Sequence, residues 1–207
     1  MEGFTAYYEV CTNLRFNNWT SVWDNVSMVP YAFQDTHWSS YENLQSIRAK
    51  AAYAKANRLG GLWFYDISAD DFNGTFCGNG TFPLIRSAKS TFENTSIPIT
   101  TTARPTTTTT MRPYNSTNRM MVCYSPNVAQ HRDGMGQFLP GNIDAGLCTH
   151  LVFSFLGVDE NGGIIWDQDG SEDEDGEIDI FMTQRIVNLK RQNPSLKVMV
   201  SIGGLFY

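Results

Sequence analysis

The densest group of side chains able to do acid–base or metal chemistry is the acidic stretch 172–177, within the letters SEDEDGE. Carboxylates bind calcium when they alternate along a loop with the spacing of an EF-hand. The residues here do not follow that spacing, and they lack the buried strand context that raises the pKa of a catalytic glutamate. A solvated loop is therefore the simpler interpretation, with a calcium loop as the alternative.

The cysteines are a second candidate for chemistry. They fall as one pair before the middle of the chain, Cys11 and Cys77, and one pair after it, Cys123 and Cys148. An even number in a chain with extracellular features suggests disulfides, most simply one within each pair. Zinc is the alternative, but no CxxC or HxxxH spacing supports it. We expect no metal and no cofactor.

Acceptor sites for N-linked glycans give the extracellular indication. Asn-x-Ser/Thr triplets begin at six positions: Asn18, Asn25, Asn73, Asn79, Asn94 and Asn115. No basic start followed by an apolar block opens the chain, so we expect the true N-terminus, with its signal peptide, to lie upstream. The sequence thus predicts a secreted, extracellular glycoprotein.

Charge and hydropathy exclude two classes of partner. The net charge is −6, and no cluster of Lys and Arg is present, which argues against nucleic acid. The longest apolar run, around residues 151–158, is too short to cross a bilayer. We therefore expect neither a nucleic acid nor a membrane partner.

A change in composition divides the chain. Residues 95–118 are nearly all Thr, Ser, Pro and Asn, which cannot bury enough apolar area to offset the loss of backbone entropy. This pattern predicts a disordered linker between two folded segments. Thr with interspersed Pro is typical of an O-glycosylated stalk, and an unmodified flexible tether is the alternative.

Secondary-structure patterns in the first segment are mixed. Residues 4–10 are strand-like, and residues 29–38 carry enough aromatic side chains for a second strand or a hairpin. Leu44, Ile47, Ala51 and Ala54 recur at helical spacing, and the glycines at 60 and 61 end that helix. A short buried strand over 62–67 and a weaker helix over 84–92 follow.

The second segment alternates more plainly. Residues 120–124 and 151–156 are continuous apolar runs, as expected of parallel strands buried on both faces. An amphipathic helix runs from Ile178 to Leu189 and is closed off by Pro194. A third buried strand over 196–202 completes the start of an α/β fold.

Several stretches resemble one family. Residues 121–157 (MVCYSPNVAQHRDGMGQFLPGNIDAGLCTHLVFSFLG) and the SIGG of 201–204 resemble the first three barrel strands of family-18 glycoside hydrolases, the chitinases and chitinase-like proteins. Residues 6–11 (AYYEVC) resemble the end of the family's small α+β insertion domain, and 29–42 (VPYAFQDTHWSSYE) its return. Residues 60–78 (GGLWFYDISADDFNGTFCG) resemble the eighth strand and the loop after it.

The order of these matches implies a domain organisation. Residues 1–94 resemble the C-terminal part of a first barrel, 95–118 form the linker, and 119–207 resemble the N-terminal part of a second barrel. The resemblance implies an α/β fold made of partial (β/α)8 TIM-barrel pieces, in a fragment of a tandem multi-domain protein. It also implies the disulfides Cys11–Cys77 and Cys123–Cys148. Because the eighth strand neighbours the first in a closed barrel, residues 62–67 and 120–124 could pair in a partial sheet.

The resemblance implies a sugar polymer as substrate. Family-18 enzymes cleave the β-1,4 bonds of chitin with one glutamate as the acid and the substrate's own acetamido group as the nucleophile, in place of the carboxylate of most retaining glycosidases. The DxxDxDxE run that supplies this acid is not among these 207 residues, so no catalytic residue is assigned and the fragment is expected to be inactive.

Sugar-binding residues follow from the same alignment. Tyr124 and Phe155 occupy first- and second-strand positions near the floor of the sugar pocket, and Tyr65 stands where the family places a Trp under the sugar. Trp63, two residues earlier, shares a strand face with Tyr65. Barrel core is the alternative interpretation of these rings. Val128 and Leu205 replace Trp residues usual in the family, which weakens the case for tight chitin binding in the second segment.

Three hypotheses remain open at this stage. The parent is an extracellular chitinase that hydrolyses chitin, or it is a lectin-like protein that binds chitin or another β-glycan without cleaving it. The third hypothesis takes the chain as a short glycoprotein with a spacer and no sugar site.

Overall fold

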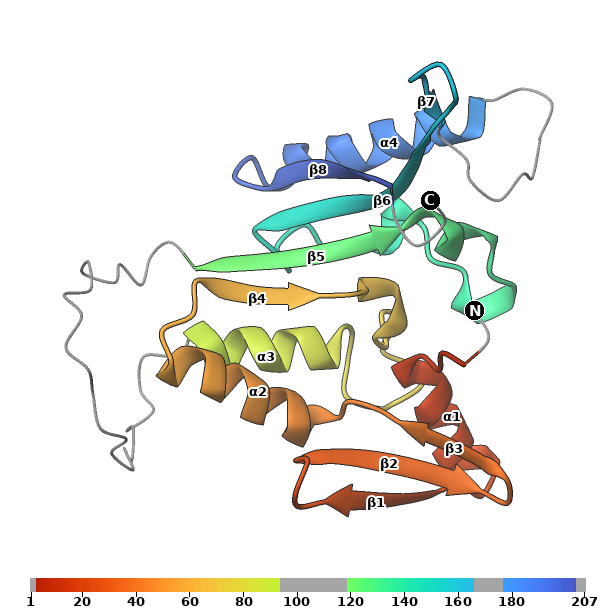
Figure 1. Cartoon of the computed structure of the whole chain (residues 1–207), viewed down its shortest axis with the longest axis vertical. Coiled ribbons are helices and arrows are strands. Elements are labelled where there is room, and N and C mark those ends of the chain that lie inside the picture. Colours follow the sequence, from red (N-terminus) through yellow and green to blue (C-terminus); the bar gives the residue numbers. More distant parts are fainter. Residues whose placement is uncertain (1–2, 94–118, 166–176, 204–207) are drawn as a thin grey trace.

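The computed structural model describes residues 3–93, 119–165 and 177–203 (Figure 1). The predicted linker 95–118, most of the acidic stretch and the glycosylation sites Asn94 and Asn115 lie outside these residues. The helices and strands, in chain order, are α1 (Tyr7–Phe16), β1 (Thr20–Asp24), β2 (Val29–Gln34), β3 (His37–Ser40), α2 (Leu44–Ala56), β4 (Gly61–Phe64), α3 (Pro83–Glu93), β5 (Met120–Pro126), β6 (His150–Val158), β7 (Ile164–Ile165), α4 (Glu177–Asn188) and β8 (Lys197–Ile202).

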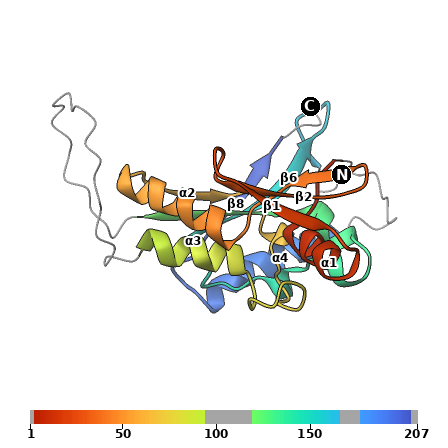
Figure 2. The same ribbon diagram turned by 90° about the horizontal axis from the view of Figure 1, so that it is seen from below.

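A mostly parallel sheet forms the centre of the molecule. Its strands β4, β5, β6 and β8 lie side by side and run in the same direction, while the short β7 pairs antiparallel with the end of β6 (Figure 1). Apolar side chains at alternate positions, such as Met121, Leu151 and Phe153, are buried on one face. Helices α3 and α4 lie on one side of this sheet (Figure 2). The arrangement confirms the predicted α/β class with parallel strands.

The predicted pairing between the two sequence segments is present. Strand β4 pairs with β5 in the register Leu62 to Met121 and Phe64 to Cys123, and the Met120 N–H donates to the Gly60 carbonyl at 2.9 Å. These residues are separated in the sequence by α3 and the linker. The pairing is the one expected of the last and first strands of a closed barrel.

One hydrophobic core joins both segments. The rings of Phe72 and Phe138 meet edge-to-face with centroids 4.9 Å apart, and both side chains are buried. At the periphery Arg86 forms an ion pair with Asp144, and the Lys89 Nζ donates to the Gly146 carbonyl at 2.6 Å. The segments 1–94 and 119–207 thus pack as one body in the described residues, and their assignment to two different barrels stays a prediction.

The strand predicted over residues 4–10 is wrong, because residues 7–10 form the first turn of helix α1 and residues 4–6 are irregular. The aromatic and β-branched side chains favoured a strand locally, but two features stabilise the helix. The Glu9 carboxylate accepts a hydrogen bond from the Ala6 N–H at 2.7 Å, which satisfies a free donor at the helix start. Tyr8 and Val10 are buried, so tertiary packing outweighs the local preference.

A small antiparallel sheet, β1–β2–β3, follows α1 and contains the predicted hairpin. Helix α2 confirms the predicted apolar spacing but ends at Ala56, before Gly60, because the chain turns at Asn57 and Arg58 has a positive φ of 54°. Strand β4 is shorter than predicted, since a single turn of 3-10 helix occupies Ile67–Ala69.

The remaining helices and strands are present with small changes at their ends, but the burial predicted for two strands is wrong. Strand β8 is largely exposed because it has a neighbour on one side only within the described sheet, and Trp63 on β4 is 64% exposed. Helix α3 covers the stretch predicted at 84–92, and α4 ends at Asn188, before a 3-10 turn over Leu189–Arg191. Both predicted disulfides are formed, with Cα–Cα distances of 5.2 Å for Cys11–Cys77 and 6.1 Å for Cys123–Cys148. Among the described residues, no helix combines the length and apolar character needed to cross a membrane.

Candidate functional site

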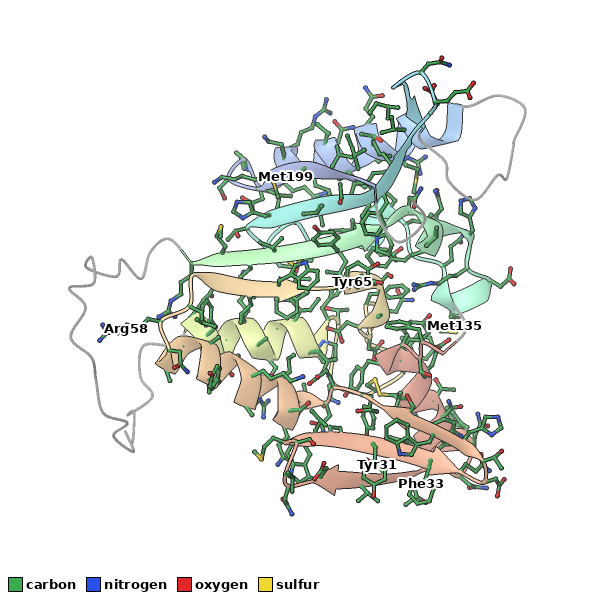
Figure 3. The ribbon with its side chains drawn as sticks, in the orientation of Figure 1. Tyr31, Phe33, Arg58, Tyr65, Met135 and Met199 are labelled. Carbon is green, nitrogen blue, oxygen red and sulfur yellow. A yellow bond between two sulfur atoms is a disulfide. The ribbon has the colours of Figure 1, made fainter. Side chains whose placement is uncertain are left out.

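Four aromatic side chains gather where the parallel strands end. Trp63 lies on β4, and Tyr65 is the first residue after the end of β4. Tyr124 lies on β5 and Phe155 on β6. Figure 3 shows Tyr65 at the end of β4, next to the neighbouring strand. In parallel α/β folds the carboxyl ends of strands from different parts of the chain converge, and ligands bind there. The location therefore makes this aromatic cluster the candidate site.

The rings of the aromatic cluster touch one another. The centroid of Tyr124 lies 5.7 Å from that of Trp63, 5.6 Å from that of Tyr65 and 6.2 Å from that of Phe155. Tyr65 lies 5.9 Å from Trp63 and 6.3 Å from Phe155. All these separations are within the range of contacting aromatic pairs. The structure thus brings together all four residues that the sequence assigned to sugar binding.

Exposure separates these rings from ordinary core residues. Trp63 is 64% exposed and Tyr65 43% exposed, while Tyr124 and Phe155 are half-buried. On the opposite face of β5 and β6, Cys123 and Leu151 are almost fully buried. Within the described residues the cluster therefore presents flat apolar rings to solvent.

Polar groups lie beside the rings. Asp66 follows Tyr65 and accepts a hydrogen bond from the Ser68 hydroxyl. Burial raises the pKa of the Tyr65 phenol, and the nearby Asp66 charge and Tyr124 add to the effect. Tyr65 is therefore a neutral phenol at physiological pH, able both to donate and to accept a hydrogen bond.

Ser154 is a buried polar residue next to the aromatic cluster in the sequence, and sequence reasoning did not single it out. Its side chain is buried on β6 next to Phe155, and its Oγ has no hydrogen-bond partner within the described part of the chain. Most buried hydroxyls are paired, so the free one of Ser154, which lies in the middle of β6 and is fully buried, is unusual. A polar residue within the apolar run 151–156 was the only signal for it in the sequence.

Two acidic residues further along the loop after β4, Asp70 and Asp71, are structural. Asp70 accepts hydrogen bonds from the N–H groups of Leu84 and Ile85 at the start of α3, and Asp71 accepts from those of Phe76 and Cys77. Burial raises the pKa of Asp70 to about 6, against the opposing effect of these backbone donors. Both carboxylates hold the loop and helix start together.

The other predicted sites are placed as follows. Asn18, Asn25, Asn73 and Asn79 are all exposed, as glycan acceptors must be. Val128, which replaces a ring usual in the family, is 37% exposed, and Leu205 lies outside the described residues. In the ranges that the structure covers, no group of three or more His, Cys, Asp or Glu side chains is arranged to hold a metal ion.

Comparisons with known proteins point in one direction. The sequence profile of the glycosyl hydrolases family 18 matches residues 1–70 and 120–206. Probable chitinase 10 of Drosophila melanogaster is 27% identical in an alignment of 254 residues. The alignment covers 98% of this chain and 11% of that protein. Chitotriosidase-1 of Mus musculus is 42% identical over 88 residues, 42% of this chain and 18% of its own length.

Among solved structures, catalytic domain 2 of the Group II chitinase of Ostrinia furnacalis is similar, with a TM-score of 0.44 and 31% identity. The match covers 48% of this chain and 26% of that structure. The chain accordingly spans only a small part of the relatives it matches, 11% of the Drosophila protein and 18% of the mouse protein.

Proposed function

Because this chain belongs to family 18 of the glycosyl hydrolases, we propose that the chain binds β-1,4-linked N-acetylglucosamine polymers on the aromatic cluster of Trp63, Tyr65, Tyr124 and Phe155. In a parent with two barrels, Trp63 and Tyr65 would serve the sugar site of the first barrel, and Tyr124 and Phe155 that of the second. The observation that carries the proposal is the mutual contact of these four partly exposed rings at the ends of three parallel strands. The apolar faces of pyranose rings bury well on flat aromatic surfaces. The Tyr65 phenol, which is partly exposed, then fixes the orientation of the sugar.

The proposal extends to domain organisation. Residues 1–94 are the end of one barrel, with the end of its insertion domain, 95–118 a Thr/Pro-rich linker, and 119–207 the first three strands of a second barrel. One support is that probable chitinase 10 matches 98% of this chain in a single alignment, so the same order of parts occurs within one related protein. The β4–β5 pairing supports only the identity of the two strands, because the eighth and first strands are neighbours in a closed barrel.

Catalysis by the parent depends on a proton donor that these residues do not contain. No DxxDxDxE run occurs in the 207 residues, so we infer that the chain binds the polymer without cleaving it. We also infer an extracellular location, on the strength of the two disulfides and the exposed glycan acceptors.

A lectin-like parent is the second candidate function. The observation that favours it is the loss of two stacking rings, with Val128 and Leu205 at positions where the family has Trp. A chitinase and a lectin share the binding step and differ in the glutamate that protonates the glycosidic oxygen. Incubation of the parent with N-acetylchitohexaose distinguishes the two. A chitinase releases shorter oligomers, whereas a lectin releases none.

The binding proposal is tested by calorimetric titration of the chain with N-acetylchitopentaose. We expect saturable binding that weakens at least about 5-fold in Tyr65→Ala, because one lost stacking contact is worth about 1 kcal/mol. Tyr53→Ala is the matched control, since Tyr53 is an exposed ring on α2, away from the aromatic cluster. Unchanged affinity in Tyr65→Ala, or no binding by the unmodified chain, would contradict the proposal. The third hypothesis, a short glycoprotein with a spacer and no sugar site, would then explain the chain better.

A further inference from the structure

A depression of about 500 Å³ lies away from the aromatic cluster, where the end of α1 meets the turn between β2 and β3. Ring, amide and imidazole side chains surround it: Phe16, Asn17, Asn18, Trp19, Gln34 and His37. Flat rings combined with amide donors and acceptors are the groups that hold a hexose, because rings cover its apolar face and amides bond its hydroxyl and acetamido groups. The composition of the depression therefore fits a sugar.

One residue of this lining is itself a glycan acceptor. Asn18 begins the triplet Asn18-Trp19-Thr20, it is exposed, and its backbone has a positive φ of 54°. Within the described ranges, the amides of Asn73 and Asn79 donate to backbone carbonyls at 3.5 and 3.0 Å, whereas no hydrogen bond is present for the amides of Asn18 and Asn25. Of these four acceptors, Asn18 and Asn25 have free amides, and only Asn18 lines the depression.

The neighbours of Asn18 are suited to the sugar that it would carry. Phe16 stands two residues before it and is 67% exposed at the end of α1. The guanidinium of Arg15 lies 5.1 Å from the centroid of the Phe16 ring and occupies one of its faces. A sugar joined to Asn18 is held at a high effective concentration beside the remaining ring surface, so even a weak contact is populated.

We propose that Asn18 carries an N-linked glycan whose first N-acetylglucosamine folds back into this depression, against Phe16 and Trp19, with its acetamido group bonded by Gln34 or His37. The inference rests on the proposed extracellular location. In the attachment step the Asn18 Nδ2 forms a bond to C1 of the sugar, the bond from C1 to a polyprenyl pyrophosphate donor breaks, the pyrophosphate leaves, and the amide loses a proton to a base. The glycan thereby covers exposed aromatic surface at the junction of α1 and the small sheet.

The experiment uses the full chain, secreted from eukaryotic cells behind a cleavable leader. The other acceptors are silenced without altering their asparagines by the substitutions Ser27→Ala, Thr75→Ala, Thr81→Ala, Ser96→Ala and Thr117→Ala. Glycopeptide mass spectrometry measures occupancy at Asn18. Thermal unfolding is then compared for the material trimmed to one N-acetylglucosamine by an endoglycosidase and for the material stripped completely by a glycan amidase.

We expect Asn18 to be occupied and the stripped form to melt about 2–4 °C below the trimmed form. Phe16→Ala should abolish this difference, whereas Tyr53→Ala, which removes a ring of similar exposure (68% against 67%), should preserve it. Phe16→Leu keeps the apolar bulk but lacks the ring face, so it should reduce the difference in melting temperature between the trimmed and stripped forms. This variant replaces Phe16→Ala in the comparison if Phe16→Ala does not fold.

An unoccupied Asn18, equal melting of the two forms, or a difference that survives the loss of Phe16 would each overturn the inference. Chitooligosaccharide binding at Tyr65 is measured separately, so failure here is distinguishable from failure of the proposed function.

Discussion

Gly61 provides a sharp test of the pairing between β4 and β5. A Cβ added at this position would lie 2.2 Å from the Met120 carbonyl oxygen and 2.8 Å from the Met120 Cβ. Ordinary contacts of a Cβ exceed 3 Å, so in Gly61→Ala the two strands must separate by about 1 Å or the ladder must distort. Overpacking of this kind costs about 1–3 kcal/mol.

The adjacent Gly60 is the matched control, because a Cβ there meets no atom within 4 Å. Both substitutions remove similar freedom from the unfolded chain, so their difference isolates the clash. In thermal or urea unfolding we expect Gly61→Ala to be less stable than Gly60→Ala by about 2 kcal/mol, or about 4–8 °C in midpoint. Equal stabilities would refute the reasoning, since they would mean that β4 does not lie against the start of β5.

Two further predictions concern stability. Burial raises the pKa of Asp70 to about 6, so near pH 5 the folded chain keeps a proton that the unfolded chain has lost. The free energy of unfolding should therefore fall by about 1 kcal/mol from pH 5 to pH 7. The urea midpoints of Asp70→Asn should lack this part of the pH dependence. If the urea midpoint of Asp70→Asn depends on pH as steeply as that of the unmodified chain, the prediction for Asp70 is wrong. Phe138→Ala should cost about 3–5 kcal/mol in urea unfolding, because this buried ring contacts Phe72 across the two sequence segments, and a loss below about 1 kcal/mol would argue that the segments do not share a core.

The parallel strands were predictable because continuous apolar runs have few other stable arrangements. Strands β5, β6 and β8 therefore match their predicted positions closely, although β8 is largely exposed and not buried as predicted. Helix α1 was not predictable, because its stability comes from the Glu9 carboxylate at the Ala6 N–H and from the burial of Tyr8, neither of which appears in the local β-like composition. Tertiary contacts decided the outcome there.

The candidate site shows the same division. The resemblance to a known family identified Trp63, Tyr65, Tyr124 and Phe155, and spacing alone would have left them as core residues. Their mutual contact depends on the β4–β5 pairing, which joins residues on opposite sides of a linker. The unpaired hydroxyl of Ser154 could not be predicted, because a serine in a strand carries no sign of whether its partner is present.

The most direct test of the central claim is an NMR titration that follows the aromatic resonances of the chain during addition of N-acetylchitopentaose, with cellopentaose as the control lacking acetamido groups. The account predicts shifts concentrated on the rings of Trp63, Tyr65, Tyr124 and Phe155 with the chitin oligomer, and much smaller shifts with the control. Shifts confined to other rings such as Tyr31 and Trp38, or no shifts at all, would contradict it.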